Sequence, residues 1–223
     1  MTPDPAALRI VVVPGLGLDA RSWAPVAEVL DVPVEVRPLP GYGMRAARGT
    51  DLSPSALGRR LGEELRDGPP AVLVGHSSGC QVAAHAASAA GGAVVGLVLV
   101  GPTTDPRAGG WAALVRRWLR TAVHEDPRQV PGLARQYART GLGSMRRGMD
   151  AARRDDLRAT LDDLRLPVLA VRGPQDRICP QDWAERLAPW CLTLTGGGHL
   201  VPCTHGPELG GVLTRFAADV APR

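Results

Sequence analysis

The chain has 223 residues, of which 44% are hydrophobic and 22% charged, and this suits one globular domain with a sizeable core. A formal net charge of +4 is compatible with an acidic partner, but one Phe and two Tyr, without interleaved aromatic and basic residues, speak against single-stranded nucleic acid. No apolar run approaches the roughly 18 residues of a membrane span. Residues 1–7 also lack the basic start and apolar stretch of a signal peptide, so we expect a cytoplasmic protein.

Short Val-rich runs alternate along the chain with longer amphipathic segments, and this alternation predicts a parallel sheet covered by helices on both faces. The predicted strands cover residues 8–13, 34–37, 71–75, 94–100, 168–172 and 191–195. Helices are predicted over residues 22–30, 53–65, 78–90, 180–187 and 207–220. The predicted fold class is therefore α/β, with a mostly parallel sheet of about six strands.

The alternation is interrupted between Pro102 and Leu166, where no segment has the pattern of a strand. Three helices are predicted there instead, over residues 110–123, 131–141 and 144–164. Because connections between strands are normally short, we interpret residues 103–165 as a helical insertion that forms a lid over the carboxyl edge of the sheet. Residues 1–223 then form a single domain.

Residues 75–79, Gly-His-Ser-Ser-Gly, link the buried strand at 71–75 to the helix that follows. In this strand–turn–helix context, the pattern G-x-S-x-G places its serine on a strained turn, with the hydroxyl exposed at the sheet edge. The glycines have no Cβ, so the strand and the helix can approach each other closely. Ser77 is therefore the predicted nucleophile.

Functional groups of a parallel sheet collect at the carboxyl ends of its strands. Asp176 follows the strand predicted at 168–172, and His199 follows the strand predicted at 191–195. A serine hydroxyl needs a base, and that base needs an orienting carboxylate, so we assign these roles to His199 and Asp176. Asp105, which follows the strand at 94–100, is the alternative carboxylate.

Two backbone N–H groups are candidates for stabilising a negatively charged oxygen in the reaction. Ser78 comes directly after the nucleophile, and Leu16 lies in the glycine-flanked loop after the first strand. Both positions are suited to an oxyanion hole. This chemistry requires neither a metal nor an organic cofactor.

Together these motifs resemble the α/β-hydrolase family, and the resemblance covers nearly the whole chain. It rests on Pro-Gly-Leu-Gly at 14–17, Pro-Leu-Pro-Gly-Tyr-Gly at 38–43, Gly-His-Ser-Ser-Gly at 75–79, Gly-Pro-Gln-Asp at 173–176 and Gly-His at 198–199. The chain order serine, acid, histidine agrees with that family. The two antiparallel strands that usually precede the first parallel strand are missing, which implies a reduced core.

The resemblance implies a serine hydrolase that cleaves an ester or thioester of a small to medium acyl substrate through an acyl-enzyme on Ser77. Two alternatives keep the same three residues: an acyltransferase or cyclase, in which another nucleophile replaces water, and a lyase that breaks a C–C bond with His199 as base. A third alternative is a non-catalytic binding protein on the hydrolase scaffold.

The predicted lid is rich in charge. Twelve arginines and six carboxylates lie between Asp105 and Arg158, so its positive excess is larger than that of the whole chain. This segment is either a solvated helical face or an anion-binding lid for a carboxylate, a phosphopantetheine arm or an acidic acyl carrier protein. Trp111 and Trp118 recur at helical spacing and are candidate substrate-binding residues on its underside, although core packing explains them equally well.

The four cysteines match no zinc-binding spacing, and free thiols are expected in a cytoplasmic protein. Cys179 and Cys203 closely follow Asp176 and His199 in the sequence. A disulfide between these two cysteines is therefore the alternative.

Overall fold

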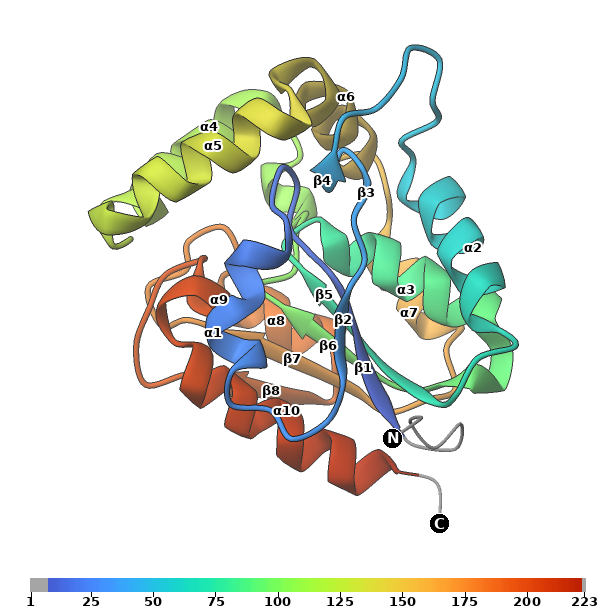
Figure 1. Cartoon of the computed structure of the whole chain (residues 1–223). Helices are drawn as coiled ribbons and strands as arrows, with labels where there is room; N and C mark the ends of the chain where they lie inside the picture. The colour runs from blue at the N-terminus through green and yellow to red at the C-terminus, as the bar shows by residue number, and fades with distance from the viewer. Residues whose placement is uncertain (1–7, 222–223) are drawn as a thin grey trace.

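The computed structural model of the chain describes residues 8–221, and its centre is one six-stranded, fully parallel sheet (Figure 1). Its strands are β1 (Arg9–Val13), β2 (Val34–Val36), β5 (Ala71–His76), β6 (Val94–Val100), β7 (Val168–Arg172) and β8 (Trp190–Thr193). Their order across the sheet is β2-β1-β5-β6-β7-β8. The predicted α/β fold with six parallel strands is confirmed.

Helices cover both faces of this sheet, because successive strand side chains alternate between two apolar cores. Val11 and Val13 of β1 pack toward one core, while Ile10 and Val12 pack toward the other. The first core is covered by α2 (Pro54–Leu65), α3 (Gly79–Ala90), α7 (Leu157–Asp162) and α8 (Gln181–Leu187). The second core is covered by α1 (Ala24–Ala27), α9 (Val201–Thr204) and α10 (Gly206–Val220).

The segment after β1 is less helical than the sequence predicts. The helix expected over residues 22–30 is reduced to α1, which follows a 3₁₀ turn over Ala20–Trp23. After β2 the chain forms two very short paired strands, β3 (Leu39–Pro40) and β4 (Gly43–Met44). These strands were not predicted, because two-residue strands rich in Gly and Pro have no detectable alternation.

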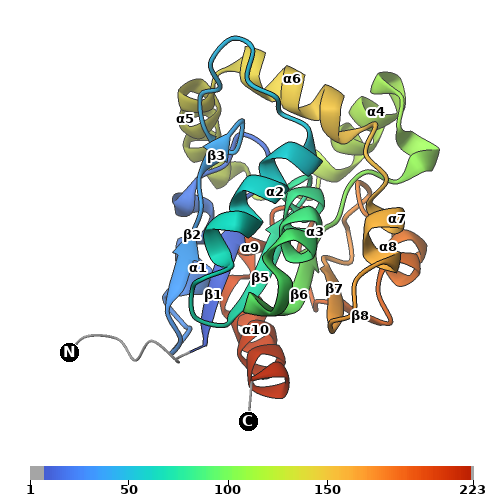
Figure 2. The same ribbon diagram turned by 90° about the vertical axis from the view of Figure 1, so that its right-hand side faces the viewer.

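Of the helices between β6 and β7, three lie above the carboxyl ends of the strands (Figure 2). They are α4 (Trp111–Ala122), α5 (Val130–Thr140) and α6 (Leu142–Ala152). The single helix predicted over residues 144–164 is wrong, since α6 ends at Ala152 and a separate helix, α7, begins at Leu157. Asp156 causes this break: its carboxylate accepts a hydrogen bond from Ala159 N at 3.0 Å and caps the new helix.

All four cysteines are free, so the predicted alternative of a Cys179–Cys203 disulfide is wrong. Cys179 is buried in the core on the α3 side of the sheet. Cys203 lies on α9 at the other face, where its thiol is 3.5 Å from the Ser22 carbonyl oxygen. Within residues 8–221, no helix combines the length and hydrophobicity required to cross a membrane.

Candidate active site

Ser77 lies on the sharp turn between β5 and α3. Its φ is 56°, in the left-handed region that residues with a side chain rarely adopt. A Cβ at Gly75 would lie 2.5 Å from Cα of Cys80, and a Cβ at Gly79 would lie 2.7 Å from the Val13 carbonyl oxygen. Only glycines at these positions let α3 pack so closely against β5 and β1, and the strained turn that the motif predicts is present.

The structure brings Ser77, His199 and Asp176 into one hydrogen-bonded chain. Nε2 of His199 is 2.8 Å from Oγ of Ser77, and Nδ1 of His199 is 2.7 Å from Oδ2 of Asp176. Asp176 follows β7 and His199 follows β8, so both loops leave the same edge of the sheet as the Ser77 turn. His199 and Asp176 are buried, whereas Ser77 is half-buried at the end of the chain of hydrogen bonds.

The carboxylate of Asp176 is held in its charged form. Its Oδ1 accepts hydrogen bonds from the backbone N–H groups of Ile178 and Cys179, each at 2.9 Å. Burial alone would raise the pKa of Asp176, but the charge of His199 and these hydrogen bonds lower the pKa below its usual value. Asp176 therefore keeps its negative charge beside the imidazole at neutral pH.

The imidazole of His199 is oriented by that carboxylate. An ionised carboxylate only accepts hydrogen bonds, so Nδ1 of His199 carries the proton and Nε2 presents its lone pair to the Ser77 hydroxyl. Burial lowers the pKa of His199, but Asp176 and the charge of Glu125 outweigh burial and raise the pKa above its usual value. The site therefore stabilises the imidazolium that forms when His199 takes a proton.

His76 packs beside the imidazole of His199. Its ring centroid is 5.1 Å from that of His199, and its Nε2 is 2.9 Å from the His199 carbonyl oxygen. Burial, helped by the neighbouring His199, lowers the pKa of His76 to about 3. His76 is therefore neutral, and its Nε2–H donates to the carbonyl group and holds the loop of His199.

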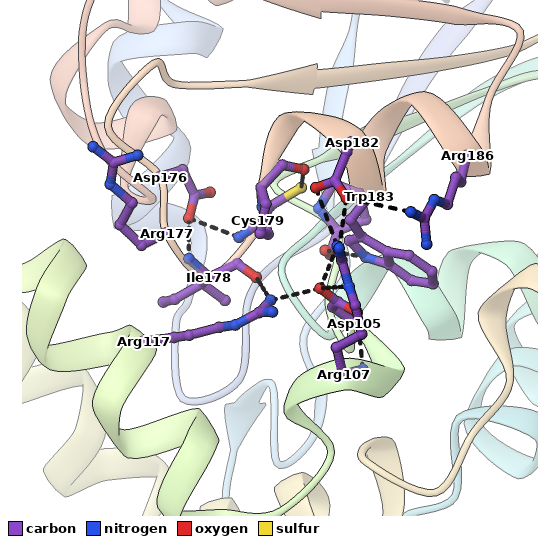
Figure 3. A network of polar contacts seen from close by, with 12 residues as sticks. Asp105, Arg107, Arg117, Asp176, Arg177, Ile178, Cys179, Asp182, Trp183 and Arg186 are labelled. Carbon is purple, nitrogen blue, oxygen red and sulfur yellow. Dashed lines mark hydrogen bonds and ion pairs between the residues drawn. The ribbon is translucent and has the colours of Figure 1, made fainter.

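Asp105, the alternative carboxylate, is paired with arginines instead of a histidine. Its side chain is only 1% exposed, and Oδ2 lies 2.8 Å from both Arg107 and Arg117. Figure 3 shows Asp105 against both guanidinium groups, with Asp182 on the other side of Arg107. The charge of Asp105 is thus balanced by two arginines, while Asp176 occupies the position beside His199.

The backbone N–H groups of Leu16 and Ser78 belong to two segments that meet at the Ser77 turn. A Cβ at Gly79 would clash with the Pro14 carbonyl oxygen, which shows how closely the loop after β1 passes the start of α3. Within residues 8–221, neither N–H group has a protein acceptor. Unpaired donors of this kind are what an oxyanion hole requires, and the role of both groups stays a prediction.

Trp111 and Trp118 lie on α4 and are not part of a core. They are 41% and 53% exposed, which is inconsistent with the core-packing alternative. The guanidinium group of Arg153 stacks on the Trp111 ring at 5.7 Å from its centroid. A role of the two indoles in substrate binding stays a prediction.

A cavity of about 560 Å³ lies between α6 and the loop after β4. Four arginines line it: Arg45, Arg48, Arg146 and Arg147. Arg147 also donates to the Ala47 carbonyl oxygen at 3.0 Å and so ties α6 to this loop. Whereas Arg153 and Arg154 pair with Asp150, no carboxylate within residues 8–221 pairs with the four cavity arginines.

The sequence does not single out three residues that contact the loops of Asp176 and His199: Arg117, Thr121 and Glu125. Glu125 accepts hydrogen bonds from the backbone N–H groups of His199 and Leu200. Arg117 was counted only as one of many lid charges, yet it contacts both Asp105 and the Ile178 carbonyl oxygen. Their only sequence signal is that all three lie on or just after one predicted helix, at intervals of four residues.

The fold and the arrangement of Ser77, His199 and Asp176 define a serine hydrolase. The chain belongs to the α/β-hydrolase family, since the model described as "Alpha/beta hydrolase family" matches residues 10–218. It is 30% identical to a pimeloyl-[acyl-carrier protein] methyl ester esterase from Xanthomonas oryzae pv. oryzae (strain MAFF 311018), over 95% of each chain. It is 28% identical to a protein of the same name from Xylella fastidiosa (strain 9a5c), again over 95% of each. The chain is accordingly an ester-cleaving enzyme.

Solved structures show the same fold at low sequence identity. A hydrolase from Oleispira antarctica superposes with a TM-score of 0.78 at 14% identity, over 96% of this chain and 91% of that one. MenH from S. aureus superposes with a TM-score of 0.76 at 16% identity, over 99% and 97%. These similarities support the architecture of the sheet and its helices.

Proposed function

We propose that this protein hydrolyses a carboxylic ester on an acyl chain attached to an acyl carrier protein, through an acyl-enzyme on Ser77. The observation that carries the proposal is the continuous hydrogen-bonded chain from Ser77 Oγ through His199 to Asp176, with distances of 2.8 and 2.7 Å. This geometry is that of a nucleophile, a general base and an orienting carboxylate.

In the first step, Ser77 Oγ forms a bond to the ester carbonyl carbon while its proton passes to Nε2 of His199. Asp176 stabilises the resulting imidazolium, because its charge and hydrogen bond raise the pKa of His199. The N–H groups of Leu16 and Ser78 stabilise the oxyanion of the tetrahedral intermediate. His199 then protonates the leaving alcohol as the C–O bond of the ester breaks, and the acyl group remains on Ser77.

In the second step, a water molecule replaces the alcohol. His199 takes a proton from this water as its oxygen attacks the acyl carbon, and the same N–H groups hold the second oxyanion. Collapse of this intermediate breaks the bond to Ser77 Oγ, which takes the proton back from His199. The products are a carboxylic acid and an alcohol, and the enzyme returns to its starting state.

The proposed carrier-protein partner is supported by charge. The relatives are named for an ester on an acyl carrier protein, and residues 103–165 carry a large excess of arginine. The unpaired arginines of the cavity beside α6 are suited to phosphate or carboxylate groups, which guanidinium groups bind through paired hydrogen bonds. On this proposal, residues 103–165 form a lid that receives the carrier, and Trp111 and Trp118 contact the acyl chain.

Steady-state hydrolysis of one methyl ester, presented free and on an acyl carrier protein, tests the proposal. We expect wild type to prefer the carrier-bound ester in kcat/KM and Ser77→Ala to hydrolyse neither form. Arg146→Ala should raise KM for the carrier-bound ester by about threefold to tenfold, since one charge-assisted contact is lost, without changing hydrolysis of the free ester.

Arg128→Ala is the matched control, because Arg128 is an exposed lid arginine that pairs with Asp126 away from the cavity. It should leave both reactions as in wild type. Hydrolysis of the ester by Ser77→Ala at the wild-type rate would contradict the acyl-enzyme. Equal kcat/KM of wild type for the free and carrier-bound esters would contradict the carrier partner.

A further inference from the structure

Helix α4 and the turn after it present polar side chains to both loops that hold the proposed base and acid. Arg117 and Thr121 lie on the helix, and Glu125 lies in the turn at its end. The three residues are four positions apart, a spacing that places side chains on one helical face. This face points to the loops after β7 and β8, which carry Asp176 and His199.

Arg117 and Thr121 contact the loop of Asp176. Arg117 Nη1 lies 2.8 Å from Asp105 Oδ2 and donates to the Ile178 carbonyl oxygen at 3.4 Å, as Figure 3 shows. Thr121 Oγ1 accepts a hydrogen bond from the Arg177 N–H at 3.0 Å. Helix α4 therefore contacts Arg177 and Ile178, the two residues that directly follow Asp176. The N–H of Ile178 in turn donates to the Asp176 carboxylate.

Glu125 contacts the loop of His199. Its Oε1 accepts hydrogen bonds from the backbone N–H of His199 at 2.5 Å and of Leu200 at 3.0 Å. A Cβ at Gly198 would lie 2.5 Å from the same oxygen, so glycine at this position allows the carboxylate to approach. Glu125 thus holds the backbone that carries the imidazole in line between Ser77 and Asp176.

Glu125 also brings a charge close to the imidazole. The titratable groups that face His199 are Asp176, Glu125 and the neutral His76, and of these Asp176 and Glu125 favour the imidazolium. The charge of Glu125 also reaches Tyr137 on α5 and Cys203 on α9, because it raises the pKa values of both groups beyond the larger effect of burial. Burial raises the pKa of Glu125 itself, although the two backbone N–H groups partly offset that effect.

We propose that Glu125 is a positioning residue for His199, and that it couples the packing of α4 to the alignment of the nucleophile and base. Two separable effects follow from the geometry. The two hydrogen bonds to the His199 loop fix the distance from Nε2 to Ser77 Oγ, and the negative charge favours the protonated imidazole. The inference rests on the proposed function, because it takes Ser77 and His199 as nucleophile and base.

The test measures the second-order rate of fluorophosphonate adduct formation at Ser77 as a function of pH, which requires no knowledge of the natural substrate. We expect Glu125→Ala to slow labelling by about tenfold to a hundredfold, because small displacements of a reacting group have effects of this size. Glu125→Gln retains an acceptor oxygen and should recover most of the rate. Both variants lose the charge, so the pKa of His199 falls and the acid limb of the pH profile moves to lower pH.

Asp126→Asn is the matched control, since it removes a neighbouring carboxylate that pairs with Arg128 and contacts neither loop. It should retain the wild-type rate and acid limb. An unlabelled wild type would refute the proposed function and this inference with it. A labelled wild type with an unchanged rate and acid limb in Glu125→Ala would refute the inference alone, as would a loss that Glu125→Gln does not reduce.

Discussion

The loops after β6 and β7 each carry a buried carboxylate at the same sheet edge, yet the two carboxylates have different partners. Asp105 and Asp176 are both about 1% exposed at the side chain. Asp105 faces the guanidinium groups of Arg107 and Arg117, whereas Asp176 faces the imidazole of His199 and two backbone N–H groups. In both cases the surrounding cations and donors outweigh burial and lower the pKa of the carboxyl group.

This difference shows that burial and place in the fold do not by themselves assign a catalytic role to an acid. A guanidinium group does not give up its proton near neutral pH, so we expect Asp105 to hold α4 through Arg117 and to take no part in proton transfer. An imidazole changes its charge near neutral pH, so the carboxylate that orients it can serve a reaction. Arg117 joins the two loops, because it contacts both Asp105 and Ile178.

The largest expected effect comes from replacing the carboxylate beside His199. Asp176→Asn should lower kcat by about 10⁴-fold, because an asparagine NH₂ group can donate to Nδ1 and hold the tautomer whose Nε2 carries a proton and cannot accept one from Ser77. Steady-state kinetics on a short chromogenic ester measure this loss. In Asp105→Asn, kcat should stay within about tenfold of wild type. An equal loss of kcat in the two variants would contradict the different roles of the two carboxylates.

Asp105→Asn should instead affect stability. The change leaves Arg117, whose side chain is 17% exposed, without its charged partner, and we expect the free energy of unfolding to fall by about 2 kcal/mol, as when a hydrogen bond to a charged group is lost. Urea denaturation measures the loss. Asp182→Asn is the control, because Asp182 is exposed and pairs with the same Arg107, and it should leave the unfolding midpoint close to that of wild type.

A smaller effect should appear in the pH dependence of that stability. Burial would raise the pKa of Asp105, but Arg107 and Arg117 lower it, so its charged form stabilises the fold above the unfolded pKa of about 3.9. That stabilisation is lost as the pH falls through the lower folded value. The difference in unfolding free energy between wild type and Asp105→Asn should therefore be constant from pH 7 to about pH 5 and narrow below about pH 4. A difference that narrows near neutral pH would contradict the pairing with arginine.

The sheet and the site at its edge could be predicted because they depend on local patterns. Val-rich runs identify buried parallel strands, and the residues that follow them must meet at one edge. The glycines around Ser77 specify a close approach of backbone segments, which the structure shows at Gly75 and Gly79. These patterns could therefore indicate Ser77 and His199 and reduce the acid to two candidates, Asp176 and Asp105.

The contacts between the segment that follows β6 and the site could not be predicted, because they join residues of unrelated pattern across the fold. Nothing in the sequence around Glu125 indicates that its carboxylate meets two N–H groups more than seventy residues away. The break between α6 and α7 was missed for a different reason: helical spacing continues through residues 144–164, and the capping by Asp156 overrides it. Charge counting likewise could not separate Arg117, which is half-buried and paired with Asp105, from the cavity arginines, which pair with no carboxylate within residues 8–221.

The central claim is that Ser77 is a nucleophile activated by His199 and Asp176. Its most direct test is the intact mass of the protein after reaction with a fluorophosphonate, followed by peptide mapping. Wild type and Asp105→Asn should each gain one adduct on the peptide that contains Ser77, Asp176→Asn should react far more slowly, and Ser77→Ala should gain none. An unmodified wild type, or an adduct that forms equally in Ser77→Ala, would contradict the claim.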